Sequence, residues 1–201
     1  MGRILFIAAA SYLLGSIPFG YLLVRAFRGE DVRRTGSGNI GATNVARSSA
    51  ALGVLTLLLD ALKGLAAVAL ASRVLFPQTS VLALAAFCAI LGHIFPLWLK
   101  FRGGKGVATG LGAFTLLAPK AILVAVAIFV AVVLIFRYVS LGSILAVAFF
   151  PLLAWFWPGH NRDPLAAALI VAASLLIIAR HHENIRRLRA GTENRSHWRR
   201  S

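Results

Sequence analysis

Charged residues are scarce in this chain. Of its 201 residues only 13% are charged, whereas 59% are hydrophobic and the mean hydropathy is +0.83. Soluble domains carry roughly a quarter charged residues, so this composition excludes a protein that stays dispersed in water. The length leaves room for one compact domain, most of which must go into membrane-spanning segments of about 20 residues.

Cysteine is almost absent as well. Cys88 is the only one and lies in an apolar run, which excludes an intramolecular disulfide. The histidines lack the His-x-x-x-His spacing on one helix face, and no cysteine or carboxylate completes a zinc site. We therefore expect no metal and no cofactor.

Seven hydrophobic runs are present, at about residues 4–24, 52–72, 81–99, 107–118, 121–136, 141–157 and 165–179. Only Pro119 and Lys120 separate the fourth and fifth runs, which are either two short spans or a re-entrant pair, and we expect two spans. The first run is long, is broken by Pro18 and leads into a Gly-rich motif, so we expect a mature helix rather than a signal peptide. The predicted fold is an all-α membrane protein, a compact bundle of about seven transmembrane helices.

Basic residues are distributed unevenly between these runs. With the N-terminus outside, sixteen of the 21 Lys and Arg residues face the cytoplasm and four face outside, while Lys63 lies inside a helix. The positive-inside rule then predicts an outside N-terminus and a cytoplasmic C-terminus. The net charge of +15 would face anionic membrane lipids, and the loops are too short for a nucleic-acid-reading module. We expect a single domain over residues 1–201 with a short basic cytoplasmic tail at about 185–201.

A Gly-rich polar loop follows the first hydrophobic run. From Thr35 to Arg47 it reads Thr-Gly-Ser-Gly-Asn-Ile-Gly-Ala-Thr-Asn-Val-Ala-Arg. Glycines let backbone amides approach an oxyanion, while hydroxyls and an arginine supply further donors. The composition favours an anion site, with a flexible loop and a helix cap at Thr43 or Asn44 as the alternative.

A second loop, residues 100–109, reads Lys-Phe-Arg-Gly-Gly-Lys-Gly-Val-Ala-Thr. A Gly-Gly-Lys-Gly turn at the start of a helix gathers free amides, the positive helix end and an ammonium around one point, as a phosphate site requires. It is not a Walker A loop, because Leu99 replaces the first glycine and Gly106 replaces the Ser/Thr. A positive-inside loop with glycine turns is the alternative.

Polar residues also cluster at the end of the last run, where residues 180–187 read Arg-His-His-Glu-Asn-Ile-Arg-Arg. His181 and Asn184 are three apart and share a helical face, although a solvated or capping histidine is the alternative. Ser143 lies at the expected cytoplasmic end of the sixth run, where its hydroxyl would face a site.

Charged residues inside the spans are a separate feature. Asp60 and Lys63 are three apart in the second run, so we expect them to pair, in a structural role. We expect His93 with Pro96 to shape the approach to the second Gly-rich loop.

Taken together, these motifs resemble the bacterial acyl-phosphate:glycerol-3-phosphate acyltransferase family. The segments that carry the resemblance are Gly15-Ser-Ile-Pro-Phe-Gly, Gly36-Ser-Gly-Asn-Ile-Gly-Ala-Thr-Asn, Asp60-x-x-Lys-Gly, Gly92-His-x-Phe-Pro, Gly103-Gly-Lys-Gly-Val-Ala-Thr and His181-x-x-Asn-Ile-x-Arg-Leu. The resemblance implies transfer of a fatty acyl group from acyl phosphate to the 1-position of glycerol 3-phosphate, with lysophosphatidic acid and phosphate as products. It places this step of phospholipid biosynthesis in the bacterial cytoplasmic membrane, with the Gly-rich loops forming a cytoplasmic active site.

The same resemblance implies the site residues. The expected catalytic residues are Ser37, Arg47, Lys105, His181 and Asn184. The expected substrate- and phosphate-binding residues are Asn39, Thr43, Asn44, Gly103, Gly104 and Ser143. His181 is either a general base or an orienting group, in which case the attacking hydroxyl passes its proton to a phosphate oxygen of the donor, the route that the resemblance favours. The His-x-x-x-x-Asp mechanism of other glycerol-phosphate acyltransferases is excluded, since no histidine has an aspartate five positions later.

A transporter of an organic phosphate is the alternative from a different class. Transporters usually contain paired repeats with sites at the midplane, and neither Gly-rich motif recurs in the other half of the chain. The sequence leaves acyl-chain preference and oligomeric state open.

Overall fold

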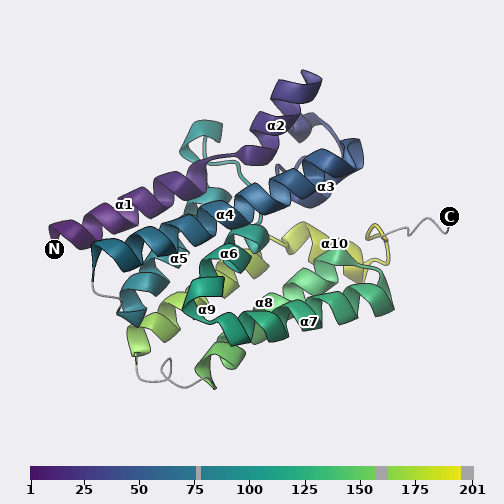
Figure 1. Ribbon diagram of the computed structural model, residues 1–201. Coiled ribbons are helices and arrows are strands. Elements are labelled where there is room, and N and C mark those ends of the chain that lie inside the picture. Colours follow the sequence, from purple (N-terminus) through teal and green to yellow (C-terminus); the bar gives the residue numbers. More distant parts are fainter. Residues whose placement is uncertain (76–77, 157–162, 196–201) are drawn as a thin grey trace. The chain divides into compact units, whose positions relative to one another are not determined.

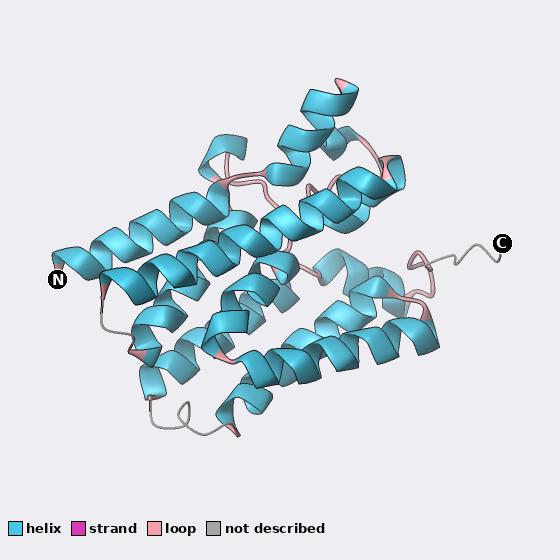
Figure 2. Cartoon of the chain, viewed as in Figure 1, coloured by secondary structure: helices cyan, strands magenta, loops and turns pink. Residues whose placement is uncertain are grey.

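The computed structural model describes residues 1–75, 78–156 and 163–195. Within these ranges the chain consists of helices and their connections, and Figure 2 shows no strand there. It forms two compact units, Met1–Leu117 and Ala118–Ser201.

The first unit contains six α-helices and two short 3-10 turns. The helices are α1 (Gly2–Ser16), α2 (Phe19–Arg28), α3 (Ala42–Ser48), α4 (Ala50–Val74), α5 (Thr79–Ile94) and α6 (Val107–Leu117), and the turns are Val32–Arg34 and Leu97–Leu99. The first hydrophobic run is interrupted at Ile17 and Pro18, where α1 ends and α2 begins. The break follows from Pro18, which has no N–H to donate and disfavours a helical residue before it.

Glycines allow the helices of the first unit to approach closely. A Cβ atom on Gly15 of α1 would overlap the carbonyl of Ala89 on α5, and one on Gly112 of α6 would overlap the carbonyl of Ala61 on α4. Small residues at such crossings let backbones meet inside a membrane, where no hydrophobic force drives helices together. In Figure 1, α1 and α4 also run side by side.

The second unit contains α7 (Pro119–Phe136), α8 (Val139–Trp155), α9 (Pro164–Ala179) and α10 (His182–Arg189). Arg137, with a φ of 64°, ends α7 in the left-handed conformation, so that α8 begins two residues later and packs back on α7. Helix α9 in turn packs against α8.

Several of these helices are long and apolar enough to cross a membrane. Four segments meet this condition by themselves: Gly2–Arg28, Ala50–Val74, Thr79–Leu99 and Pro119–Phe136. A fifth candidate is α9 together with α10, which are bent by 55°, while α6 and α8 are apolar but shorter.

The helical segments confirm the predicted fold class of an all-α membrane bundle. Every predicted hydrophobic run is largely helical, although the first is divided between α1 and α2 and the third continues past α5 into the Leu97–Leu99 turn. Trp157, at the end of the sixth run, lies outside the described residues. The 11 residues of α6 rise only about 16 Å, roughly half the thickness of a bilayer core. That α6 crosses completely therefore stays a prediction.

Candidate active site

Asn44 organises the first Gly-rich loop. Its Nδ2 donates to the carbonyl oxygens of Val32 and Thr35, both at 3.1 Å, and of Asn39 at 2.9 Å. Its Oδ1 accepts the Ser37 backbone N–H at 2.8 Å, and the residue is only 4% exposed. Both ends of the Asn44 amide thus engage the loop backbone, which makes it a residue that shapes the loop.

Ser37, Thr43 and Arg47 are exposed in this loop. Gly36 has a φ of 58°, and a Cβ atom there would lie 3.2 Å from the Arg47 guanidinium, so the arginine passes across the turn next to Ser37. Asn39, in contrast, accepts the Gly41 N–H through Oδ1 at 2.7 Å, just before α3 begins. Ser37, Thr43 and Arg47 are therefore the predicted residues that this loop presents outward.

A small hydrophobic cluster joins the two Gly-rich loops of the first unit. It consists of Val24, Val32, Ile40, Val45 and Leu99, with Tyr21 and Leu52 packed against it. Ile40 and Val45 belong to the first loop and α3, whereas Leu99 directly precedes the second loop. Both loops therefore lie at the same end of this unit.

The second loop is bonded to the end of α5. The N–H groups of Gly103 and Gly104 donate to the carbonyl oxygens of Ile94 at 3.1 Å and His93 at 3.0 Å. These amides cap α5 rather than face an anion. The donors at this point are instead the half-buried Lys105 and the first-turn amides of α6, which begins after Gly106 at a φ of 90°.

Three buried side chains lie next to this loop: Asp60, Lys63 and His93, here called the buried triad. Lys63 Nζ lies 2.7 Å from Asp60 Oδ1, which confirms the pair predicted from their spacing, and His93 Nδ1 lies 3.5 Å from the same oxygen. Lys63 also donates to the Ile17 carbonyl at 2.7 Å, where α1 gives way to α2.

In the second unit, Glu193 binds the predicted Asn184. Glu193 Oε1 accepts from Asn184 Nδ2 at 2.6 Å and from Ser140 Oγ at 2.7 Å, and its Oε2 accepts from Arg187 Nε at 2.7 Å. Burial raises the pKa of Glu193, but the hydrogen bonds from Ser140, Arg187 and Asn184 outweigh it and hold the pKa below its ordinary value. Sequence reasoning missed this role, although Glu193 is the only acidic side chain in residues 185–201 of the sequence.

His181 and Ser143 are both buried in this unit. His181 Nδ1 lies 2.8 Å from the Ile177 carbonyl, and because a carbonyl only accepts, Nδ1 carries the proton. In the neutral ring Nε2 is then the accepting nitrogen. Ser143 donates its hydroxyl proton to the Val139 carbonyl one turn earlier, at 2.9 Å.

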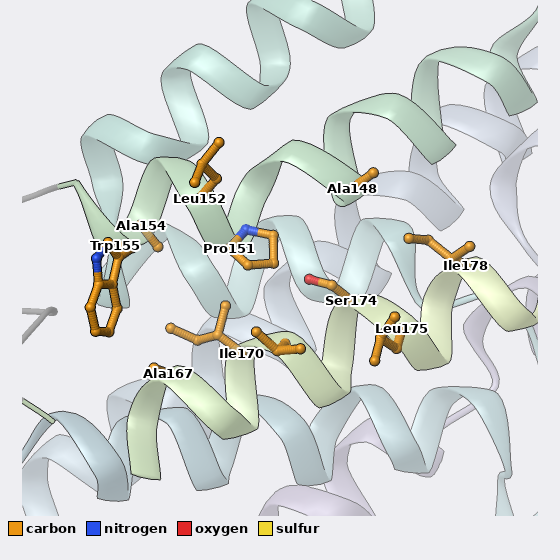
Figure 3. A pocket seen from close by; sticks show the side chains of 11 residues that line it. Ala148, Pro151, Leu152, Ala154, Trp155, Ala167, Ile170, Ser174, Leu175 and Ile178 are labelled. Atoms are coloured by element: carbon orange, nitrogen blue, oxygen red, sulfur yellow. The ribbon is translucent and has the colours of Figure 1, made fainter. Parts of the chain in front are cut away.

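The second unit also contains an apolar cavity of about 550 Å³ between α8 and α9. Figure 3 shows Pro151 of α8 and Ser174 of α9 among the residues that line it. Ser174 is 3% exposed, and its hydroxyl has no hydrogen-bond partner among the described residues.

Among the described residues no group of three or more His, Cys, Asp or Glu residues is placed to hold a metal ion.

Comparison with known proteins gives consistent matches along nearly the whole chain. Residues 5–191 match the sequence profile of a family described as glycerol-3-phosphate acyltransferase. The chain is 49% identical to the glycerol-3-phosphate acyltransferase of Syntrophotalea carbinolica, over 92% of this chain and 94% of that relative. It is 50% identical to the one of Trichlorobacter lovleyi, over 95% of this chain and 96% of that relative.

Two solved structures have the same fold. They are crystal structures of PlsY (YgiH), an integral membrane glycerol 3-phosphate acyltransferase, in a glycerol 3-phosphate form and a lysophosphatidic acid form. The first is 38% identical and gives a TM-score of 0.90, with 96% of each chain covered. The second is 37% identical with a TM-score of 0.87, and 96% of this chain and 95% of that chain are covered.

Proposed function

Because this chain belongs to the glycerol-3-phosphate acyltransferase family, we propose that it transfers a fatty acyl group from acyl phosphate to the 1-hydroxyl of glycerol 3-phosphate. The products are lysophosphatidic acid and phosphate. The observation that carries the proposal is the placement of two Gly-rich loops at one end of the first unit, with Ser37, Arg47 and Lys105 among their donors. The reaction needs such donors, since both substrates carry a phosphate.

The chemistry requires binding and charge neutralisation more than activation. Acyl phosphate is already a mixed anhydride, so the hydroxyl oxygen forms a bond to the acyl carbon while the bond from that carbon to the phosphate oxygen breaks. The hydroxyl proton goes to the released phosphate. Arg47 and Lys105 offset the phosphate charge, and Ser37 donates a hydrogen bond, so that the substrates are held in a reactive orientation.

We assign His181 and Asn184 to substrate orientation in the second unit. The Nδ1 proton of His181 is directed to the Ile177 carbonyl, so this bond to the α9 backbone fixes the orientation of the ring. If His181 were instead a general base, a His181 variant would lose kcat but would still bind glycerol 3-phosphate. The loops act at the cytoplasmic face of the bacterial cytoplasmic membrane, with the N-terminus outside, as the distribution of basic residues favours.

The donor is tested by comparing palmitoyl phosphate with palmitoyl-coenzyme A in purified protein supplied with glycerol 3-phosphate. A thioester has no phosphate next to its acyl carbon, so it forfeits charge-assisted contacts worth roughly 2 to 4 kcal/mol. We expect its kcat/KM to be about 30- to 1000-fold lower. Equal kcat/KM values for the two donors would contradict acyl phosphate as the donor.

The same assay separates the enzyme from a transporter of an organic phosphate. Detergent micelles have no compartments, so a transporter produces no new compound in them. We expect lysophosphatidic acid to form in proportion to time and protein concentration. Substrate binding without any product would favour the transporter.

A further inference from the structure

The buried triad has no part in the reaction described above. Asp60 is 2% exposed, His93 is 3% exposed and Lys63 is 4% exposed, and all three belong to helices of the first unit. A buried ion pair contributes little to stability because desolvation offsets its attraction. Charged groups at membrane depth more often organise a functional site.

His93 supports the second Gly-rich loop in two ways. Its backbone carbonyl accepts the Gly104 N–H at 3.0 Å, and its imidazole lies directly against the Gly104 Cα. A Cβ atom on Gly104 would overlap His93 Nε2 and would lie 2.9 Å from both Cδ2 and Cε1. The position of the Gly104 backbone, and with it that of Lys105, therefore depends on the position of the His93 imidazole.

Asp60 lies at the other edge of the ring, and Lys63 pairs with Asp60. Asp60 Oδ1 lies 3.5 Å from His93 Nδ1, on the side of the imidazole away from Gly104. Lys63 neutralises the same oxygen at 2.7 Å and also donates to the Ile17 carbonyl, so Lys63 connects Asp60 to the break between α1 and α2. A carboxylate at one ring nitrogen is a common way to fix the orientation of a histidine.

We propose that His93, held by Asp60 and Lys63, is a positioning residue for the phosphate-binding loop. The ring fixes the backbone at Gly104, which aims Lys105 and the first turn of α6 at a substrate phosphate. This inference rests on the proposed function, in which that phosphate belongs either to the acyl donor or to glycerol 3-phosphate. Gly103 and Gly104 then serve close packing on His93 and the end of α5.

The test compares His93→Gln with His93→Asn in the full-length protein in detergent. The glutamine amide reaches the Nε2 side that supports Gly104, whereas the asparagine amide reaches only the Nδ1 side that faces Asp60. We expect His93→Asn to raise the KM for one phosphate substrate about 10- to 100-fold, and His93→Gln to stay within about threefold of wild type. Measuring KM for acyl phosphate and for glycerol 3-phosphate separately identifies whose phosphate the loop holds.

A second variant protects the test against misfolding. Asp60→Asn combined with Lys63→Met removes both charges together, because either change alone would leave an uncompensated buried charge. We expect it to raise the same KM as His93→Asn. Ser11→Ala is the matched control, since Ser11 is also fully buried in the first unit.

Two outcomes would overturn the proposal. One is a folded His93→Asn protein with both KM values within twofold of wild type. The other is a KM change no larger than that of Ser11→Ala, with only the melting temperature lowered, which would make the triad merely structural.

If the wild type turns over neither donor, the proposed function fails. The increase in melting temperature with inorganic phosphate or glycerol 3-phosphate then still tests the loop, because it needs no turnover.

Discussion

Arg47 and Lys105 are the cations of the two Gly-rich loops in the first unit. Each offers a charge-assisted contact to a phosphate, worth roughly 2 to 4 kcal/mol at a transition state. We therefore expect Arg47→Ala and Lys105→Ala each to lower kcat/KM by about 30- to 1000-fold while the protein stays folded. Turnover is measured with palmitoyl phosphate and glycerol 3-phosphate.

Arg73→Ala is the control for these two variants, because Arg73 is exposed near the opposite end of α4 and should change turnover less than twofold. Near-normal turnover by folded Arg47→Ala or Lys105→Ala would remove that residue from the site.

We expect Glu193 to contribute to the stability of the second unit. Glu193→Gln removes the charge-assisted bond from Arg187, which is worth roughly 1.5 to 3 kcal/mol, so the melting temperature should fall by about 3 to 12 °C. The pKa of Glu193 is lowered, so its contribution is present above the unfolded value near 4.5 and is lost as the pH falls through the folded pKa. Melting curves between about pH 3 and pH 7 should therefore converge for the two proteins at low pH.

Glu183→Gln serves as the control for Glu193→Gln, since the Glu183 side chain is 56% exposed and its nearest contact with Arg187 is 3.8 Å. A melting temperature unchanged by Glu193→Gln at neutral pH would contradict this role.

At the scale of elements, the cavity between α8 and α9 suits an acyl chain. Its volume of about 550 Å³ lies within the usual range of ligand pockets, and its lining is almost entirely apolar (Figure 3). Each buried methylene contributes about 0.8 kcal/mol, so filling the cavity should penalise long chains most. We expect Ala167→Phe to raise KM for palmitoyl phosphate by about tenfold while KM for a ten-carbon acyl phosphate changes little.

The neighbouring Ala168 provides the control for this variant, because it is exposed and does not line the cavity. Ala168→Phe should leave both KM values unchanged. An equal rise of both KM values in Ala167→Phe would place the acyl chain elsewhere.

At the scale of the whole molecule, topology depends on the short helix α6. Cysteines introduced at Ser37 and Gly191 should be labelled from the cytoplasmic side only, and those at Gln78 and Lys120 from outside only, in a background with Cys88→Ala. Labelling is measured in intact cells with a membrane-impermeant maleimide, before and after the cells are opened. Cytoplasmic labelling of a cysteine at position 120 would show that α6 turns back instead of crossing, and the count of seven spans would be wrong.

The sequence by itself determined the class of protein and most of its helices. Hydrophobic length, the position of Pro18 and the distribution of Lys and Arg are local properties, and they predict spanning helices, the break between α1 and α2 and an orientation without reference to tertiary contacts. The spacing of Asp60 and Lys63 likewise predicted their pair, because residues three apart in a helix share a face.

Only the tertiary structure decided how the polar residues are used. Asn44 binds the Val32 carbonyl twelve positions away, and Ser140 binds Glu193 across 53 positions. The amides of Gly103 and Gly104 cap α5, although the loop composition had suggested that they face an anion. A donor or acceptor is chosen by distance and direction in space, and the chain must fold before residues remote in sequence are close enough to bond.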